Sequence, residues 1–177
     1  MTSRRHRPII AAGMLSALVL ALATAPAVAK PHAMAMPPDA PGYLPDDVAS
    51  RTVTVVADAP ASAGIVVLTE AIAVKETGPR AAVAKFGETY AFAPATFAVH
   101  RDEPTRITFR NLQPDDTHDF MLADPGYEVL MKVALPPLAD TSYVFTFHRE
   151  GLFPFYCSMH QPAMSGQILV LPPKPGG

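Results

Sequence analysis

Short runs of β-branched and aromatic residues, separated by turn signals, recur through the second half of this chain and constrain its fold more than any other feature. Ile107 and Phe109 alternate with polar residues, which is the period of a strand buried on one face. Comparable runs occupy residues 96–100, 105–111, 142–148, 152–157 and 166–171. Several short strands at close spacing predict an all-β fold, an antiparallel Greek-key β-sandwich or barrel.

The first half of the chain is less decisive. Runs at 52–57 and 64–69 indicate short strands, whereas residues 69–87 fit either a strand or a short helix that glycine and proline interrupt. We therefore leave residues 51–80 open between an N-terminal extension and the first strands. The main β domain is placed at residues 81–173, followed by a short tail at 174–177.

The N-terminus has the three parts of a secretory signal peptide. Three arginines precede an apolar run at residues 9–22, and small residues at 27–29 predict cleavage after Ala29. The apolar run is short for a membrane span of about 20 residues, which favours a cleaved signal (1–29) over a retained anchor. The route of export, Sec or twin-arginine, stays open. Proline-rich residues 30–50 predict a flexible leader, and we expect a periplasmic or secreted protein.

Charge argues against nucleic acid as a partner. The chain has 14 basic and 16 acidic residues, and the predicted signal removes three of the basic ones and none of the acidic ones. The remaining 11 basic and 16 acidic residues leave a net charge of −5, without the basic stripe that phosphates require. We expect the mature chain to be a monomer with no membrane span.

The chain has one cysteine, Cys157, which an exported protein must protect by burial, by a bond to another chain or by a metal. His160 and Met164 follow it in the segment FYCSMHQPAMSGQILVL. Thiolate, imidazole and thioether are the soft donors that copper prefers. His118 lies in a polar loop after the strand that ends near Asn111, and is the candidate for a fourth ligand. One cysteine, two histidines and a weakly bound methionine form a blue-copper site.

On these residues, the range 81–172 resembles the cupredoxins, the family of plastocyanin, amicyanin, azurin and pseudoazurin. In that family the first histidine follows an asparagine-bearing strand end. The other ligands come in the order cysteine, histidine, methionine from one loop, between an aromatic run and a glycine-led last strand. The resemblance implies a cupredoxin-like fold in which one type 1 copper ion is bound by His118, Cys157, His160 and Met164.

The resemblance also implies a function. Cupredoxins carry single electrons between transient redox partner proteins, and the C-terminal histidine ligand, here His160, is the surface port for the electron. We therefore expect no enzyme activity and no catalytic residue. Met159 and Met121 are near enough to compete with Met164 for the axial position.

Alternatives differ in how well the residues fit them. A binuclear copper centre needs a second cysteine, and a thiol hydrolase would expose an oxidisable thiol without a clear oxyanion loop. Zinc accepts the same ligands as copper, although the methionine favours copper. The other function that stays open is copper handling, in which a periplasmic chaperone, buffer or assembly factor moves the metal itself.

Overall fold

Ten β-strands dominate the part of the chain that the computed structural model describes, residues 42–176. The predicted signal peptide and residues 30–41 of the predicted leader lie outside the described residues. The elements are η1 (Ala49–Arg51), β1 (Val53–Val56), β2 (Ala63–Ala73), α1 (Arg80–Phe86), β3 (Thr89–Ala93), β4 (Thr96–His100), β5 (Thr105–Asn111), β6 (His118–Ala123), β7 (Val129–Leu135), β8 (Asp140–Phe147), β9 (Gly151–Tyr156) and β10 (Ser165–Leu171).

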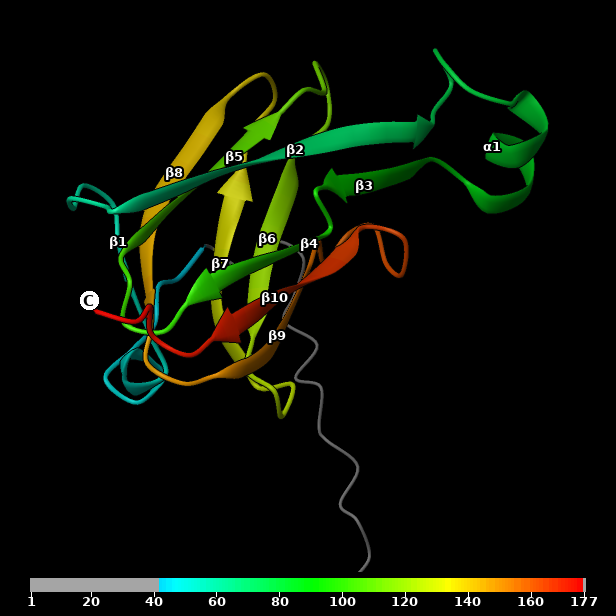
Figure 1. Ribbon diagram of the computed structural model, residues 1–177. Coiled ribbons are helices and arrows are strands. Elements are labelled where there is room, and N and C mark those ends of the chain that lie inside the picture. Colours follow the sequence, from blue (N-terminus) through cyan, green and yellow to red (C-terminus); the bar gives the residue numbers. More distant parts are fainter. Residues whose placement is uncertain (1–41, 177) are drawn as a thin grey trace, which may run out of the picture. The chain divides into compact units, whose positions relative to one another are not determined.

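The strands form two five-stranded sheets (Figure 1). One sheet has the order β1-β8-β5-β2-β3, and the other has the order β4-β10-β9-β6-β7. The predicted all-β sandwich is confirmed, and both sheets are mixed, because β2 pairs with β5 in parallel and β4 pairs with β10 in parallel. Alternation of apolar residues reports which face of a strand is buried but not the direction of its neighbour, so the sequence could not reveal these two pairs.

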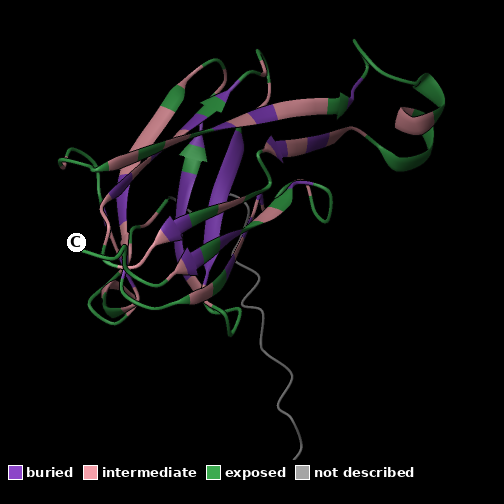
Figure 2. Cartoon of the chain, viewed as in Figure 1, coloured by how far each residue is buried: buried purple, intermediate pink, exposed green. Residues whose placement is uncertain are grey.

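Aromatic side chains from both sheets fill the space between them. Phe109 and Phe120 lie with ring centroids 4.3 Å apart, and Phe147 and Phe153 lie 5.0 Å apart. All four are fully buried and belong to one hydrophobic cluster, which Figure 2 shows as buried segments facing one another. This interior holds both sheets as one rigid frame, because close-packed aromatic rings leave little room for movement.

The ambiguous segment at residues 69–87 contains both structures that its pattern allowed. Its first residues extend β2 as far as Ala73, and α1 occupies residues 80–86. Helix α1 has no buried residue and projects from the sandwich between β2 and β3 (Figure 1). Because β1 pairs with β8 and β2 pairs with β5 in the first sheet, residues 53–56 and 63–73 are strands of the sandwich.

The chain passes from one sheet to the other between β3 and β4, beside the start of β10. There Gln167 donates its backbone N–H to the carbonyl oxygen of Ala95 at 2.8 Å. A Cβ atom at Gly166 would lie 2.1 Å from that same oxygen and 2.4 Å from the ring of Phe155. Only glycine fits this close approach, so Gly166 allows the last strand to dock directly after the cysteine-containing loop.

Candidate metal centre

Three strands of one sheet, β6, β9 and β10, and the loop between the last two position the predicted ligands. His118 is the first residue of β6, and Cys157 directly follows the last residue of β9. These strands are antiparallel neighbours in which Met121 pairs with Tyr156, so the start of β6 lies beside the residues that follow β9. His160 lies in the loop between β9 and β10, and Met164 is the residue before β10.

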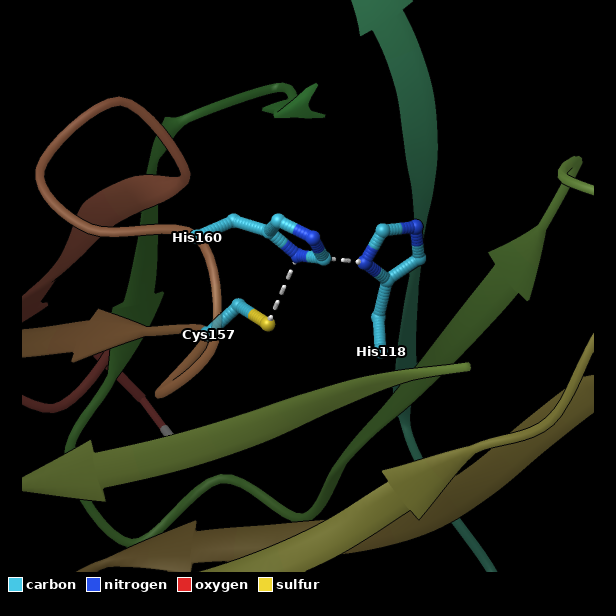
Figure 3. Close-up of side chains that lie close together, drawn as sticks. All are labelled: His118, Cys157 and His160. Atoms are coloured by element: carbon cyan, nitrogen blue, oxygen red, sulfur yellow. Dashed lines mark hydrogen bonds between the residues drawn. The ribbon is translucent and has the colours of Figure 1, made fainter. Parts of the chain in front are cut away.

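Three of the four side chains converge in space (Figure 3). The Nδ1 atoms of His118 and His160 lie 3.1 Å apart, and the Sγ atom of Cys157 lies 3.5 Å from the Nδ1 atom of His160. One donor atom from each of the three residues lies within 4.8 Å of the other two. Metal–nitrogen and metal–sulfur bonds of about 2.0 and 2.3 Å place donor atoms about 3 to 4 Å from one another, so this cluster fits one ion.

Burial sets the chemistry of the donor atoms. His118 and Cys157 are fully buried. Desolvation lowers the pKa of His118 to about 4, with a further lowering from the nearby His160, and it also lowers the pKa of His160. Both imidazoles are therefore neutral near pH 7 and present lone pairs. Burial raises the pKa of the Cys157 thiol to about 11, so binding a metal as thiolate must release a proton.

The buried ring of His118 offers a further test of the fit to a metal. Its Nε2 atom is buried and has no hydrogen-bond partner among the described residues, while its Nδ1 atom faces His160. All of the ring's polar contacts in this part of the chain are thus on the side of the donor cluster. Sulfur, two imidazole nitrogens and an adjacent methionine match the donor set of a copper site.

Backbone hydrogen bonds fix the loop that carries three of the predicted ligands. The N–H of Met164 donates to the carbonyl oxygen of His160 at 2.9 Å, and the N–H of Cys157 donates to that of Met164 at 2.9 Å. The side-chain amide of Gln161 donates to the carbonyl oxygen of Cys157 at 2.9 Å. These bonds hold the backbone of Met164 beside that of Cys157 and His160, so the loop is ordered by its own residues.

A carboxylate links the two ligand-bearing strands behind the cluster. Asp119, the residue after His118, accepts hydrogen bonds from the N–H of Ser158 at 2.6 Å and from the Ser158 hydroxyl. Ser158 is the residue after Cys157. The carboxylate also forms an ion pair with Lys132 at 3.3 Å. Asp119 therefore ties the position of the candidate ligand His118 to that of the candidate ligand Cys157.

Comparisons with known proteins were made with the sequence and with the fold. No family model and no curated protein matches the chain in sequence. Among solved structures, the fold is similar to auracyanin B, with a TM-score of 0.49 at 14% identity over 69% of this chain and 99% of that chain. It is also similar to auracyanin A, a "blue" copper protein from Chloroflexus aurantiacus, with a TM-score of 0.45 at 15% identity over 61% of this chain and 98% of that chain. A reduced amicyanin matches with a TM-score of 0.42 at 20% identity over 68% of this chain and 99% of that chain. These likenesses concern the fold alone.

One expectation from the sequence needs correction. The sequence predicts a polar loop at His118, but this residue begins β6 and is fully buried. The proline and three polar residues before it, 114–117, hide the start of the strand, because the pattern before His118 resembles a solvated turn. His100 and His148 lie apart from the cluster: His100 contacts the carbonyl oxygen of Pro172, and His148 contacts Thr54 and Asp102.

The methionines near the cluster differ in exposure. Met164 is fully buried and Met121 is nearly so, whereas the side chain of Met159 is 42% exposed. Two other residues at the site were missed in the sequence, Asp119 and Tyr90. Tyr90 could be found as a strand residue from the alternation in TYAFA, but nothing in its neighbourhood indicates contact with histidines 28 and 70 residues later.

No helix within residues 42–176 is long and apolar enough to cross a membrane.

Proposed function

We propose that this chain is an exported mononuclear type 1 copper protein that carries single electrons between redox partners. The observation that carries the proposal is the convergence of the buried Cys157 thiol with the Nδ1 atoms of His118 and His160. Met164, held next to these residues by the loop's backbone hydrogen bonds, would be the weak axial ligand. When bound there, copper would supply a one-electron couple between Cu(I) and Cu(II).

The residues themselves would make that couple fast. Donor atoms that lie this close together need little movement to bind a metal, and the loop of residues 157–164 is held by its own hydrogen bonds. Burial of Cys157 and His118 excludes water from two of the donors. A rigid, dry site lowers the reorganisation that accompanies a change of charge.

The surface beside His160 would serve as the docking site of a transient partner. His160 is partly exposed, and Met159, Pro162 and Ala163 around it are exposed. This mostly apolar set of three residues is called the collar below. A small apolar contact of this kind suits an encounter that must form and dissociate quickly. We propose export through the predicted signal peptide, with the mature protein acting as a monomer in the periplasm or outside the cell.

The proposal is tested by the visible spectrum of the copper-loaded chain. Thiolate-to-Cu(II) charge transfer should give intense visible absorption that is lost in Cys157→Ser and disrupted in His118→Ala. His148→Ala is the matched control, since that histidine is remote from the cluster, and it should retain the absorption. Colour that persists without Cys157 would refute the assignment of the thiolate.

A second measurement separates the electron carrier from a copper-handling protein. An electron carrier should retain its copper through many cycles of reduction and oxidation. A chaperone or buffer should release Cu(I) readily to a competing chelator. Loss of most of the copper within a few cycles would therefore replace electron transfer with copper delivery.

A further inference from the structure

Tyr90 packs against both histidines of the candidate metal centre. It is the second residue of β3 and is only 1% exposed. Its ring centroid is 4.8 Å from that of His118, with the planes at 64°, and 4.6 Å from that of His160, with the planes at 56°. One side chain from the opposite sheet therefore packs against both imidazoles at once.

The hydroxyl of Tyr90 is anchored. It donates a hydrogen bond to Asp116, two residues before His118, and lies 3.5 Å from a carboxylate oxygen of Glu88. The segment containing Asp116 is itself fixed, because the side-chain amide of Asn111 donates to the carbonyl oxygen of Asp116 at 2.8 Å and to that of Leu135 at 2.9 Å. Leu135 pairs with His118 in the sheet.

These contacts extend into the frame of both sheets. Thr69 on β2 donates its hydroxyl proton to the side-chain oxygen of Asn111 at 2.6 Å. Thr69 and Asn111 are both buried, as is the ring of Tyr90. Buried polar groups with all partners satisfied are rigid, because any displacement leaves a donor or acceptor without a partner. The ring of Tyr90 is thus held at both ends, by the backbone of β3 and by its hydroxyl.

The second ring nitrogen of His118 makes such a hold necessary. A histidine that binds metal is usually oriented by a hydrogen bond from its other ring nitrogen. The Nε2 atom of His118 has no such partner among the described residues. Rotation of this ring is therefore opposed by packing rather than by a hydrogen bond on Nε2, and Tyr90 makes an edge-on aromatic contact with the ring.

We propose that Tyr90 is a positioning residue of the metal centre, which holds the imidazoles of His118 and His160 in the orientation that binds metal. The proposal rests on the metal site put forward above. Asp116 acts through Tyr90 by fixing its hydroxyl. The consequence is retention: neither imidazole can turn away from the cluster without displacing a ring that is anchored to the frame, so a bound metal should leave slowly.

Phe92 provides a matched control on the same strand. It is two residues after Tyr90, so its side chain points to the same face of β3, and it is 2% exposed. Its ring contacts Phe120 and Phe155 rather than a histidine. Replacing either aromatic residue by leucine removes a buried ring from this strand, but only the change at Tyr90 should affect the imidazoles.

The experiment compares Tyr90→Leu, Tyr90→Phe, Asp116→Asn and Phe92→Leu with the unchanged chain. In metal-free protein, the ring resonances of His118 and His160 in NMR spectra report whether the imidazoles hold one orientation. In copper-loaded protein, the rate of loss to a chelator reports retention. Tyr90→Leu should broaden both sets of resonances and speed the loss of copper about tenfold, the scale of outer-shell effects on metal sites. Tyr90→Phe and Asp116→Asn keep a ring in place and should fall between Tyr90→Leu and the unchanged chain.

Two results would overturn the proposal. One is Tyr90→Leu matching Phe92→Leu in copper loss and imidazole resonances. The other is a loss of copper from Tyr90→Phe that is as fast as the loss from Tyr90→Leu, although Tyr90→Phe leaves a ring in place. If Tyr90→Leu fails to fold, the comparison of Tyr90→Phe and Asp116→Asn with the unchanged chain still decides, because both should speed copper loss measurably. A chain that binds no copper through Cys157 would instead refute the proposed function. The ring resonances of His118 and His160 in the metal-free protein would then still test whether Tyr90 orients the two imidazoles.

Discussion

Asp119 and Lys132 form an ion pair at 3.3 Å in which each side chain is only 4% exposed. Both charges have been taken out of water, and the carboxylate also accepts two hydrogen bonds from Ser158. The pair therefore lies directly behind the segment that begins with Cys157. A buried pair of this kind tolerates loss of both charges far better than loss of one.

From this pairing we predict a specific pattern in a double-mutant cycle. Lys132→Met leaves the Asp119 carboxylate buried without its cation and should lower the free energy of unfolding by about 3 kcal/mol. Asp119→Asn alone should also destabilise, because it leaves the lysine charge. The double variant removes both charges and should recover most of the loss, measured by urea unfolding of the metal-free protein.

The exposed pair of Arg110 and Asp140 is the matched control for this cycle. Their side chains lie 2.8 Å apart with 51% and 47% exposure, so solvent screens the interaction. Arg110→Met should change the unfolding midpoint very little. Additive losses in the Asp119 and Lys132 variants, with no recovery in the double variant, would show that the two charges do not depend on each other.

Met164 should influence the reduction potential more than it influences copper binding. A thioether bonds weakly at the axial position but donates some charge, which favours Cu(II). Met164→Leu should therefore keep the copper and raise the potential on the order of 60 mV, a tenfold shift toward the reduced state for a one-electron couple. Cyclic voltammetry of the copper-loaded variant measures the change.

Met159→Leu makes the same substitution in the same loop at an exposed side chain. It should leave the potential close to that of the unchanged chain. The opposite result, a shift in Met159→Leu and none in Met164→Leu, would assign the axial position to Met159. No shift in either variant would direct attention to Met121.

The stability of the metal-free protein should fall in mild acid because of His118. Its pKa is about 4 in the folded chain and 6.5 in its ordinary state, so between these values the unfolded chain binds a proton that the folded chain rejects. The contribution is complete above pH 6.5 and is lost as the pH falls toward 4. A difference of this size corresponds to about 3 kcal/mol. Burial lowers the pKa of His160 too, which adds in the same direction.

Urea unfolding of the metal-free chain at pH 7.5 and pH 4.5 measures this loss. His118→Gln removes the titrating group and should flatten the dependence between these two values. A variant with the same acid sensitivity as the unchanged chain would mean that other groups control it.

The sequence predicts the C-terminal half of the site better than the rest, for physical reasons. Cys157, His160 and Met164 share one short loop, so their proximity follows from chain connectivity alone. His118 meets them only because β6 and β9 are antiparallel neighbours, a pairing between residues about 40 positions apart. The sequence predicts His118 as a candidate ligand, but it does not predict the burial of this residue at the start of a strand.

The roles of Tyr90, Asp119 and Lys132 are the hardest to predict from the sequence. Each is a common residue in a strand-like segment, and its role comes from contacts with other strands that local alternation does not report. Lys132 stands in an otherwise apolar run, where a lysine usually indicates an exposed face, yet its charge is buried against Asp119. A local sequence pattern indicates the average burial preference of each residue type. These three residues depart from that average because their partners on other strands bury them beside the site.

The collar should control electron exchange without controlling copper binding. Ala163 is exposed next to His160, and Ala163→Glu places a charge there without removing a ligand side chain. An apolar interface excludes an unpaired charge because the charge must be desolvated. Electron exchange with a cognate partner should slow about tenfold, the equivalent of roughly 1.4 kcal/mol, while the visible spectrum and the copper affinity stay the same.

Ala61→Glu controls for the added charge itself. Ala61 is exposed, and the next residue, Ser62, donates its N–H to the carbonyl oxygen of Pro104, just before the start of β5. The donor cluster lies near the other end of β5, where the side chain of Asn111 bonds to Asp116. This variant should exchange electrons at the unchanged rate, at low and at physiological salt. Equal slowing in both variants would assign the effect to net charge rather than to docking at the collar. If exchange in Ala163→Glu is unaffected while copper release to a chelator changes sharply, the collar serves metal transfer, and copper delivery becomes the function to test.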